Sequence, residues 1–554
     1  MLPAGAVAVT WRDPWLAAVL GVAAVTFSLQ LSWGLPNGNA SWAADAIGPI
    51  TAMGIVRHSF AEWNSGWYYF KYPLGYPFLV FLAASPYMLW LFLTGGWRSP
   101  TSVYPYGFED PERALFVMAM FGRCLNVAFA LGVVAVTYGI ARRLLGPWPA
   151  RIAAFLLATA YPLIYYAHTT NLDISYLFWL LLALYAAIAA AESNEVRPWV
   201  VLGVAAAMAV STKEQGFAFL LPLPILALSR RVAIDGVAEL WGRRSLAMAS
   251  AAIVSVVAAN NIWFNPMGFV ARIAFLLGRP LEPVNVRLAP VEFGLWKGAK
   301  EWVYVRQLWD GVESTFGAPV VIVAIVGLVL VLFRRRTAAA WLLLPAAAQY
   351  YLSLRGLDLI TLRYLLPISA IVAILAGYAL NEVSRLAGAR PWRVAPIALG
   401  VMLALLSVAR AIDMHWLFYD DSRYRAEAWI AENAPAGEVV EYYQKETFVP
   451  RFAGSVRGQH IEMGERSIEK FQARRPWGAV TSSASKQSIA HGWNPDWRET
   501  RNLLKPVPHA LEFQEALSRG ELGYREAVVI RQDPALLRLR ITSLAPEIKI
   551  YVRE

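Results

Sequence analysis

The sequence is poor in charge and contains one cysteine. Only 16% of its 554 residues are charged, whereas a soluble globular domain carries about 25%. Hydrophobic residues make up 57% of the chain, and its mean hydropathy is +0.43. These values exclude a disordered chain, a coiled coil and an ordinary soluble enzyme. A single cysteine, Cys124, excludes an intrachain disulfide and any metal cluster built from cysteines.

Several well-known motifs are also missing. The chain has no HExxH or CxxC metal-ligand spacing, no Gly-rich phosphate loop and no GxSxG elbow. Its net charge of +11 could indicate nucleic acid binding, but the arginines stand in short clusters between apolar blocks. In a membrane protein such clusters set the topology, so we expect no nucleic acid partner.

What the sequence does contain is a series of long apolar blocks, which end near Ala411. Their length favours a polytopic α-helical membrane domain over residues 1–412, followed by a soluble domain over 413–554. The first block is too long for a signal peptide and is expected to remain as an anchor. The expected spans are 14–33, 114–140, 151–167, 172–191, 199–212, 215–229, 245–264, 318–333, 338–354, 364–380 and 394–412.

Four arginine clusters predict the orientation of these eleven spans. With all four in the cytoplasm, the N-terminus lies inside and the C-terminus outside, as in a bacterial-type inner membrane. The first loop, 34–113, is then extracytoplasmic, and its apolar segment 76–96 is interpreted as a helix beside the membrane rather than a span. The clusters are Arg142, Arg143 and Arg151; Arg230, Arg231, Arg243 and Arg244; Arg334, Arg335 and Arg336; and Arg385, Arg390 and Arg393.

Ionisable residues near the outer ends of several spans form the candidate site. A charge at membrane depth is costly and therefore marks a functional candidate. Each also has a structural interpretation: Asp173 could cap a helix, Lys213 could pair with Glu214, and Arg363 could be an interfacial anchor. Carboxylates facing cations at this level suit chemistry at a phosphate-linked group. The candidates are Asp45, Asp173, Lys213, Glu214, Arg123 and Arg363.

The order of short motifs resembles a known superfamily. The motifs are Asp45, Lys71-Tyr-Pro-Leu-Gly-Tyr-Pro77, Gly122-Arg-Cys-Leu-Asn126, the hairpin with Asp173, Ser211-Thr-Lys-Glu214 and Arg363-Tyr-Leu-Leu-Pro367. Together, over about residues 14–380, they resemble the GT-C superfamily of polyprenyl-phosphate-sugar-dependent glycosyltransferases. The nearest types are the family 39 enzymes: protein O-mannosyltransferases, lipid A aminoarabinose transferases and lipopolysaccharide-core transferases.

The resemblance implies a role for each matching residue. Asp45 would be the general base and Asp173 a supporting carboxylate, while Lys213, Arg363 and Arg123 would bind the donor phosphate. Candidate substrate contacts are Lys71, Tyr72, Glu214 and His168, although a structural role is favoured for His168. Many relatives carry Asp-Glu in the first loop, whereas here Ala46 follows Asp45. A Trp-Trp-Asp motif is absent, which argues against the oligosaccharyltransferase branch.

The expected fold is thus a GT-C-like membrane domain of about eleven helices with a small extracytoplasmic α/β domain. A helix is expected at 422–433 and β-strands near 438–443, 527–531, 537–541 and 548–552. The expected function is transfer of a sugar from a polyprenyl phosphate in the membrane to a lipid, glycan or protein hydroxyl on the extracytoplasmic face, by direct displacement with inversion. No definite cofactor follows, and a divalent metal is left open. The alternative is a transporter or flippase of lipid-linked sugars.

Overall fold

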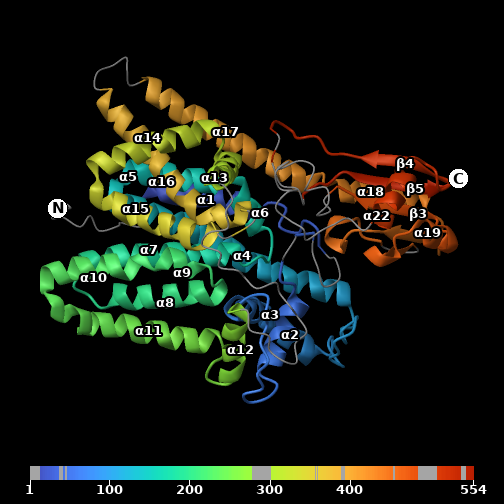
Figure 1. Cartoon of the computed structure of the whole chain (residues 1–554), viewed down its shortest axis with the longest axis horizontal. Helices are drawn as coiled ribbons and strands as arrows, with labels where there is room; N and C mark the ends of the chain where they lie inside the picture. Colours follow the sequence, from blue (N-terminus) through green and yellow to red (C-terminus); the bar gives the residue numbers. More distant parts are fainter. Residues whose placement is uncertain are drawn as a thin grey trace. The chain divides into compact units, whose positions relative to one another are not determined.

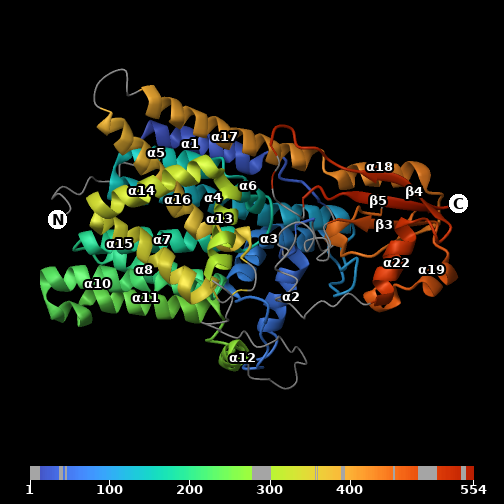
Figure 2. The same cartoon turned by 45° about the horizontal axis from the view of Figure 1, so that its top comes forward.

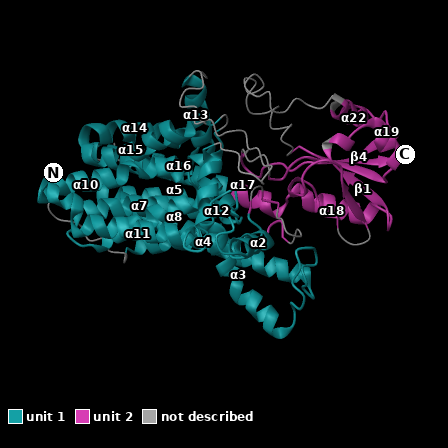
Figure 3. Cartoon of the chain, turned by 60° about the horizontal axis from the view of Figure 1, so that its bottom comes forward, with its two compact units in different colours: residues 1–31, 47–411 teal, residues 32–46, 412–554 magenta. Residues whose placement is uncertain are grey.

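The chain folds into two compact units in a computed structural model (Figure 3). Unit 1 comprises Met1–Leu31 and Ile47–Ala411, and unit 2 comprises Ser32–Ala46 and Ile412–Glu554. Unit 2 therefore contains a short piece of the first loop as well as the C-terminal region. The structure describes residues 13–35, 42–43, 46–277, 301–355, 357, 360–387, 394–452, 456–483, 508–537, 539 and 544–554.

Unit 1 is built from helices (Figure 1). Many begin with a proline in the first turn, where the missing N–H has no helical partner to lose. The α-helices are α1 (Pro14–Ser28), α2 (Pro49–Ser59), α3 (Gly75–Thr94), α4 (Pro111–Leu145), α5 (Pro147–Ala158), α6 (Tyr161–Ala167), α7 (Asp173–Glu192), α8 (Arg197–Thr212), α9 (Gly216–Leu220), α10 (Pro222–Asp235), α11 (Arg243–Ala259), α12 (Pro266–Leu276), α13 (Glu301–Phe316), α14 (Ala318–Arg334), α15 (Arg336–Gln349), α16 (Leu362–Leu386) and α17 (Val394–Tyr419), which continues into unit 2. A short 3-10 helix, η1 (Val237–Trp241), precedes α11, and a five-residue π-helix, η2 (Tyr350–Leu354), extends α15.

The helices confirm a polytopic membrane protein. Among the described residues, seven helices are long and apolar enough to cross a membrane, or nine if each of two bent pairs counts as one span. The bent pairs are α5 with α6, at 57°, and α13 with α14, at 114°. Of the expected spans, those at 14–33, 199–212 and 338–354 correspond to shorter helices, of 15, 16 and 14 residues.

Helix α3 also meets the length and hydropathy criteria for a span. We expected this segment to lie beside the membrane. Its position beside the membrane therefore stays a prediction.

Small residues let the central helices approach closely. Figures 1 and 2 show α7, α8 and α11 lying side by side. A Cβ added to Gly203 of α8 would lie 2.3 Å from the carbonyl oxygen of Met248 in α11. A Cβ on Gly327 of α14 would lie 2.0 Å from the carbonyl oxygen of Leu375 in α16. Such contacts are typical of membrane helices, where packing rather than water drives association.

Unit 2 contains a mixed five-stranded sheet with the order β2-β1-β3-β5-β4. Strand β1 pairs in parallel with β2 and β3, whereas β5 pairs antiparallel with β3 and β4. The expected helix is α18, and three expected strands coincide with β1, β4 and β5; most of 537–541 lies outside the described residues. The elements are α18 (Ser422–Asn433), β1 (Val439–Tyr442), η3 (Glu446–Phe448), β2 (Arg457–His460), η4 (Met463–Glu465), α19 (Ile468–Arg474), β3 (Gly478–Ser482), α22 (Pro508–Ser518), β4 (Tyr524–Ile530) and β5 (Ile548–Arg553).

Within unit 2, two tryptophans attach the first-loop segment to the C-terminal region. Nε1 of Trp33 donates to Oδ2 of Asp421 at 3.1 Å. The fully buried ring of Trp42 lies 4.3 Å from the guanidinium of Arg423 and 4.9 Å from that of Arg451. Two cations close to one buried indole stabilise its position. The segment is therefore an integral part of unit 2.

Candidate functional site

A buried ion pair lies where α7 begins. Nζ of Lys213, at the C-terminal end of α8, lies 2.6 Å from Oδ1 of Asp173, the first residue of α7. The two residues are 6% and 1% exposed. The amide of Asp173 donates to Oδ1 of Asn171 at 3.1 Å, and the N-cap residue of α7 is Leu172, which provides no side-chain cap. Lys213 pairs with Asp173 rather than with its neighbour Glu214.

Two residues that open α16 complete this cluster. The ammonium of Lys213 lies 4.4 Å from the ring centre of Tyr364, and the guanidinium of Arg363 lies 5.1 Å from the same ring. Arg363 also interacts electrostatically with Asp173. Residues from α7, α8 and α16 thus form one group of two cations, one carboxylate and one aromatic ring, which we call the Asp173 cluster.

Two residues of α4 position the loop that precedes Asp173. Nδ2 of Asn126 donates to the carbonyl oxygens of Thr169 and Asn171, at 2.8 Å each, and its Oδ1 accepts from Tyr76 at 3.0 Å. One turn earlier, a Cβ on Gly122 would lie 2.7 Å from Cγ2 of Thr170. The side chain of Asn126 and the absence of one at Gly122 together hold the loop against α4.

The first loop reaches the same place. Tyr72 packs in an apolar group with Leu172, next to Asp173. Lys71 is exposed, and its ammonium lies 5.5 Å from the ring centre of Tyr72. The amide of Ile47 donates to the carbonyl oxygen of Thr170 at 3.1 Å. Two separate parts of the loop therefore contact the Asp173 hairpin.

Glu214 turns away from this cluster. It accepts a hydrogen bond from Nε of Arg272, in α12, at 2.7 Å. The same guanidinium donates to the carbonyl oxygen of Phe70 in the first loop. The pair therefore ties α12 and the first loop to the turn that carries Lys213.

Arg123 and His168 contact the end of the first helix. The buried Nη1 of Arg123 donates to the carbonyl oxygen of Leu31 at 2.5 Å. The ring nitrogens of His168 lie 2.7 Å from the carbonyl oxygen of Ile164 and 2.6 Å from that of Leu29. Both nitrogens of His168 therefore have backbone partners, which favours the structural role expected for it.

Asp45 lies outside the described residues. A boundary between the two units follows Ala46: the segment Ser32–Ala46 belongs to unit 2, whereas Ile47 belongs to unit 1. Among the described residues, no group of three or more His, Cys, Asp or Glu side chains could hold a metal ion.

Sequence reasoning missed Asn126, Tyr364 and Arg272. The first two stand inside motifs that we singled out for their neighbours Arg123 and Arg363. A buried amide in an apolar helix needs partners, so Asn126 could have been found on that ground. Arg272 follows no motif, and its contacts with Glu214 and Phe70 join distant parts of the chain.

The cluster carries two positive charges and one negative charge at the end of a bundle of apolar helices. A surplus of fixed cations in a partly desolvated position favours an anion such as a phosphate. Fold and cluster thus define a multi-pass membrane protein with a candidate anion-binding site at one end of its helices.

Comparison with known proteins agrees with this class. Residues 116–264 match the family model of dolichyl-phosphate-mannose-protein mannosyltransferase. Over these residues the match confirms the resemblance to GT-C glycosyltransferases that the motifs predicted. A search of curated proteins finds no match.

Several solved structures are similar to this chain. ArnT from Cupriavidus metallidurans in the apo state is 17% identical, with 87% of this chain and 95% of that chain covered and a TM-score of 0.45. The oligosaccharyltransferase AglB from Archaeoglobus fulgidus, in complex with an inhibitory peptide and a dolichol-phosphate, is 15% identical, with 76% of this chain covered and a TM-score of 0.43. This chain spans 58% of AglB. The S. cerevisiae Pmt1-Pmt2 complex bound to the sugar donor is 16% identical, with 48% of this chain and 35% of that chain covered and a TM-score of 0.33.

Proposed function

We propose that this protein is an integral membrane glycosyltransferase that takes a sugar from a polyprenyl-phosphate donor and transfers it to a hydroxyl acceptor. The observation that carries the proposal is the Asp173 cluster, with its excess of positive charge at the end of the spanning helices. A lipid phosphate in one leaflet would lie at this level, because its tail is confined to the hydrocarbon core. The family match over residues 116–264 supports the same reaction class.

The proposed reaction is a direct displacement. A carboxylate takes the proton from the acceptor hydroxyl while the hydroxyl oxygen bonds to the anomeric carbon. The bond from that carbon to the phosphate oxygen breaks, and polyprenyl phosphate leaves with the electron pair. Attack opposite the leaving group inverts the anomeric configuration.

Roles follow from the charges. Arg363 and Lys213 would neutralise the phosphate as it leaves. Asp173 holds the ammonium of Lys213 and is thereby committed to a cation, so it suits a supporting role better than that of base. We assign the base to Asp45, whose chain continues directly to Ile47 and its hydrogen bond with Thr170.

We propose further that the cluster faces the extracytoplasmic side of a bacterial-type inner membrane, with the N-terminus in the cytoplasm. The arginine clusters support this orientation. A reporter fused after Arg336 should therefore read cytoplasmic, and one fused after Glu554 should read extracytoplasmic. If both reporters read on the same side, the orientation is wrong.

We propose that the C-terminal domain, residues 413–554, lies on the extracytoplasmic side, as the arginine clusters predict, and that the acceptor is a lipid, glycan or protein hydroxyl.

The test is incubation of the purified protein with polyprenyl-phosphate sugars. Release of free polyprenyl phosphate, or of sugar onto water, should follow for the correct donor and should be lost in Arg363→Gln. A transporter or flippase would move the intact donor between leaflets of a vesicle without breaking the sugar–phosphate bond. Movement without any hydrolysis or transfer would contradict the proposal.

A further inference from the structure

A second charged region lies at the opposite end of the same helices. Asp173 opens α7 and Glu192 ends it, a separation of about 28 Å along the helix axis at 1.5 Å per residue. Likewise, Arg363 lies at the start of α16 and Arg385 near its end, about 33 Å apart. These lengths match the hydrocarbon core of a bilayer, about 30 Å. The end with Glu192 and Arg385 therefore lies about one hydrocarbon thickness from the Asp173 cluster.

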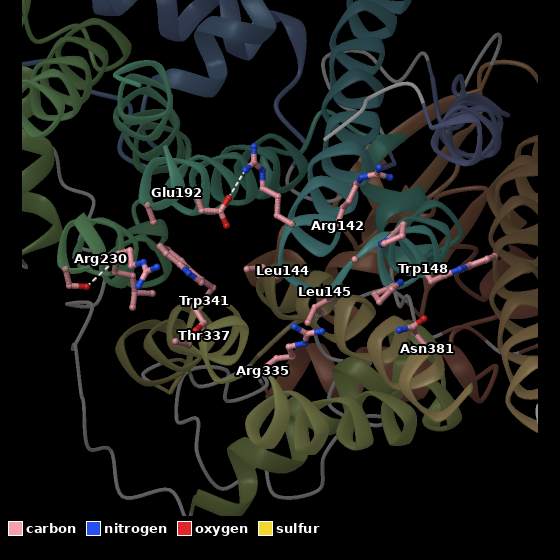
Figure 4. Close-up of a pocket in the computed structure, with 18 of the residues that line it drawn as sticks. Arg142, Leu144, Leu145, Trp148, Glu192, Arg230, Arg335, Thr337, Trp341 and Asn381 are labelled. Carbon is pink, nitrogen blue, oxygen red and sulfur yellow. Dashed lines mark hydrogen bonds and ion pairs between the residues drawn. The ribbon is translucent and has the colours of Figure 1, made fainter. Parts of the chain in front are cut away.

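That end contains a cavity of about 740 Å³. Six arginines line it, from α4, α10, α16 and the residue before α15, against a single acidic lining residue, Glu192. Figure 4 shows Arg142, Arg230 and Arg335 on different sides of the cavity. The arginines are Arg142, Arg143, Arg230, Arg231, Arg335 and Arg385.

Acidic groups around the cavity compensate only some of these charges. Arg143 pairs with Glu192 at 2.8 Å, and Arg142 pairs with Asp13 at 3.3 Å. Similarly, Arg231 pairs with Asp235, and Arg385 pairs with Glu382 at 3.3 Å. Among the described residues, the exposed side chains of Arg230 and Arg335 have no carboxylate within ion-pair distance: Glu192 is nearby but pairs with Arg143, and Arg335 contacts only the neutral hydroxyl of Tyr378.

The remaining wall is apolar. Leu144, Leu145 and Leu226 line the cavity together with two tryptophans. Trp148 is 55% exposed, and its ring lies 4.9 Å from the guanidinium of Arg151. Exposed tryptophans are typical of the level where lipid head groups meet acyl chains. A basic cavity with an apolar wall at this depth fits a ligand with a phosphate at one end and a hydrocarbon chain at the other.

We propose that this cavity binds the phosphate of an anionic phospholipid, with Arg230 and Arg335 as the contacts that are not already neutralised. Basic pockets between membrane helices bind lipid head groups in this way. Guanidinium groups suit the role because their paired N–H groups match two phosphate oxygens. The volume lies within the range of small-molecule sites. This site is separate from the Asp173 cluster and does not depend on the proposed transfer reaction.

The test uses the full chain in a neutral detergent, with thermal unfolding and native mass spectrometry as readouts. Phosphatidylglycerol should raise the unfolding temperature and remain bound, whereas phosphatidylcholine should do neither. In Arg230→Gln/Arg335→Gln the apparent affinity for phosphatidylglycerol should fall by roughly tenfold or more, since each arginine loses a charge-assisted contact. Both side chains are exposed, so the variant should fold, which circular dichroism checks.

The matched control is Arg98→Gln/Arg113→Gln, which removes two arginines outside the cavity and should bind like the unchanged protein. Inorganic phosphate and polyprenyl phosphate are further arms. Equal stabilisation by inorganic phosphate alone would overturn the assignment to a lipid, and binding of polyprenyl phosphate only would assign the cavity to that lipid instead of a phospholipid. Unchanged phosphatidylglycerol binding in Arg230→Gln/Arg335→Gln would overturn the site itself.

Discussion

Nζ of Lys213 lies 2.6 Å from Oδ1 of Asp173, and the two residues come from the end of α8 and the start of α7. Both are almost fully buried, at 6% and 1% exposure. Neither charge could be buried here alone, because an isolated ion loses its hydration without compensation. The pair is therefore a structural unit as well as a candidate part of the site, and its two roles can be separated by mutation.

Lys213→Met should destabilise the protein by about 3–5 kcal/mol, because it leaves the Asp173 carboxylate buried without its nearest cation. The double variant Asp173→Asn/Lys213→Met removes both charges and should recover most of the stability. Thermal or denaturant unfolding of the purified protein measures these differences.

The matched control for this cycle is Lys549→Met, which breaks a 2.9 Å pair with Glu526 on the surface of unit 2. Its effect should be about 0–1 kcal/mol, as is usual for such pairs. Donor use should remain low in Asp173→Asn/Lys213→Met even though stability returns. Full recovery of donor use would limit the pair to a structural role.

Arg363→Gln should weaken use of the lipid donor by roughly ten- to a hundredfold, since one charge-assisted contact with a phosphate contributes about 1.5–3 kcal/mol. The expected change is in the KM for the donor or in kcat/KM, with little change in the KM for the acceptor. Initial rates at varied donor concentration give these values.

The control for Arg363 is Arg306→Gln, which removes an arginine on α13 that is 63% exposed at its side chain. It should leave the donor KM unchanged. A normal donor KM in Arg363→Gln would place Arg363 among interfacial anchors.

Asn126→Ala should loosen the loop before Asp173. The change removes two hydrogen bonds to Thr169 and Asn171 and leaves buried carbonyl groups without a partner, a loss of about 1–3 kcal/mol for each such group. Hydrogen exchange of the peptide that covers residues 168–173 should become faster. Asn433→Ala, at an exposed helix end, should not change exchange there, and unchanged exchange in Asn126→Ala would show that the loop is held by other contacts.

Helices that depend on a local residue pattern could be predicted from the sequence, but contacts between distant residues could not. Apolar blocks of sufficient length identified most spans, and the helix at 422–433 followed from its own residues. The partner of Lys213 could not be read from the chain, because Asp173 is 40 residues away and the adjacent Glu214 offered the simpler pair. Only the packed helices bring α7, α8 and α16 together.

The first loop provides the clearest case of a relationship that the sequence conceals. We expected residues 34–113 to act as one extracytoplasmic loop. In the structure its first part belongs to unit 2 together with Trp33, the last residue of the expected first span, which binds Asp421 across 388 residues. No motif next to either residue in the sequence predicts that contact. By contrast, the charge of Asp45 after the first span was visible at once.

Asp45→Asn should abolish sugar transfer while preserving binding of the lipid donor. Asparagine has nearly the same size and can still accept a hydrogen bond, so the protein should fold. It cannot take a proton near neutral pH, and loss of a general base typically lowers the rate by about 10²–10⁴-fold. Asp173→Asn should lower the rate less, because the amide keeps an acceptor for Lys213 and no committed proton transfer is lost. Rates measured with saturating donor, together with donor binding measured separately, distinguish the two variants.

A transporter would tolerate Asp45→Asn and Asp173→Asn about equally, since neither carboxylate would have to take a proton in a committed step. Near-normal transfer by Asp45→Asn would exclude Asp45 as the base, and the search would then move to Asp173 and to Glu62 in the same loop.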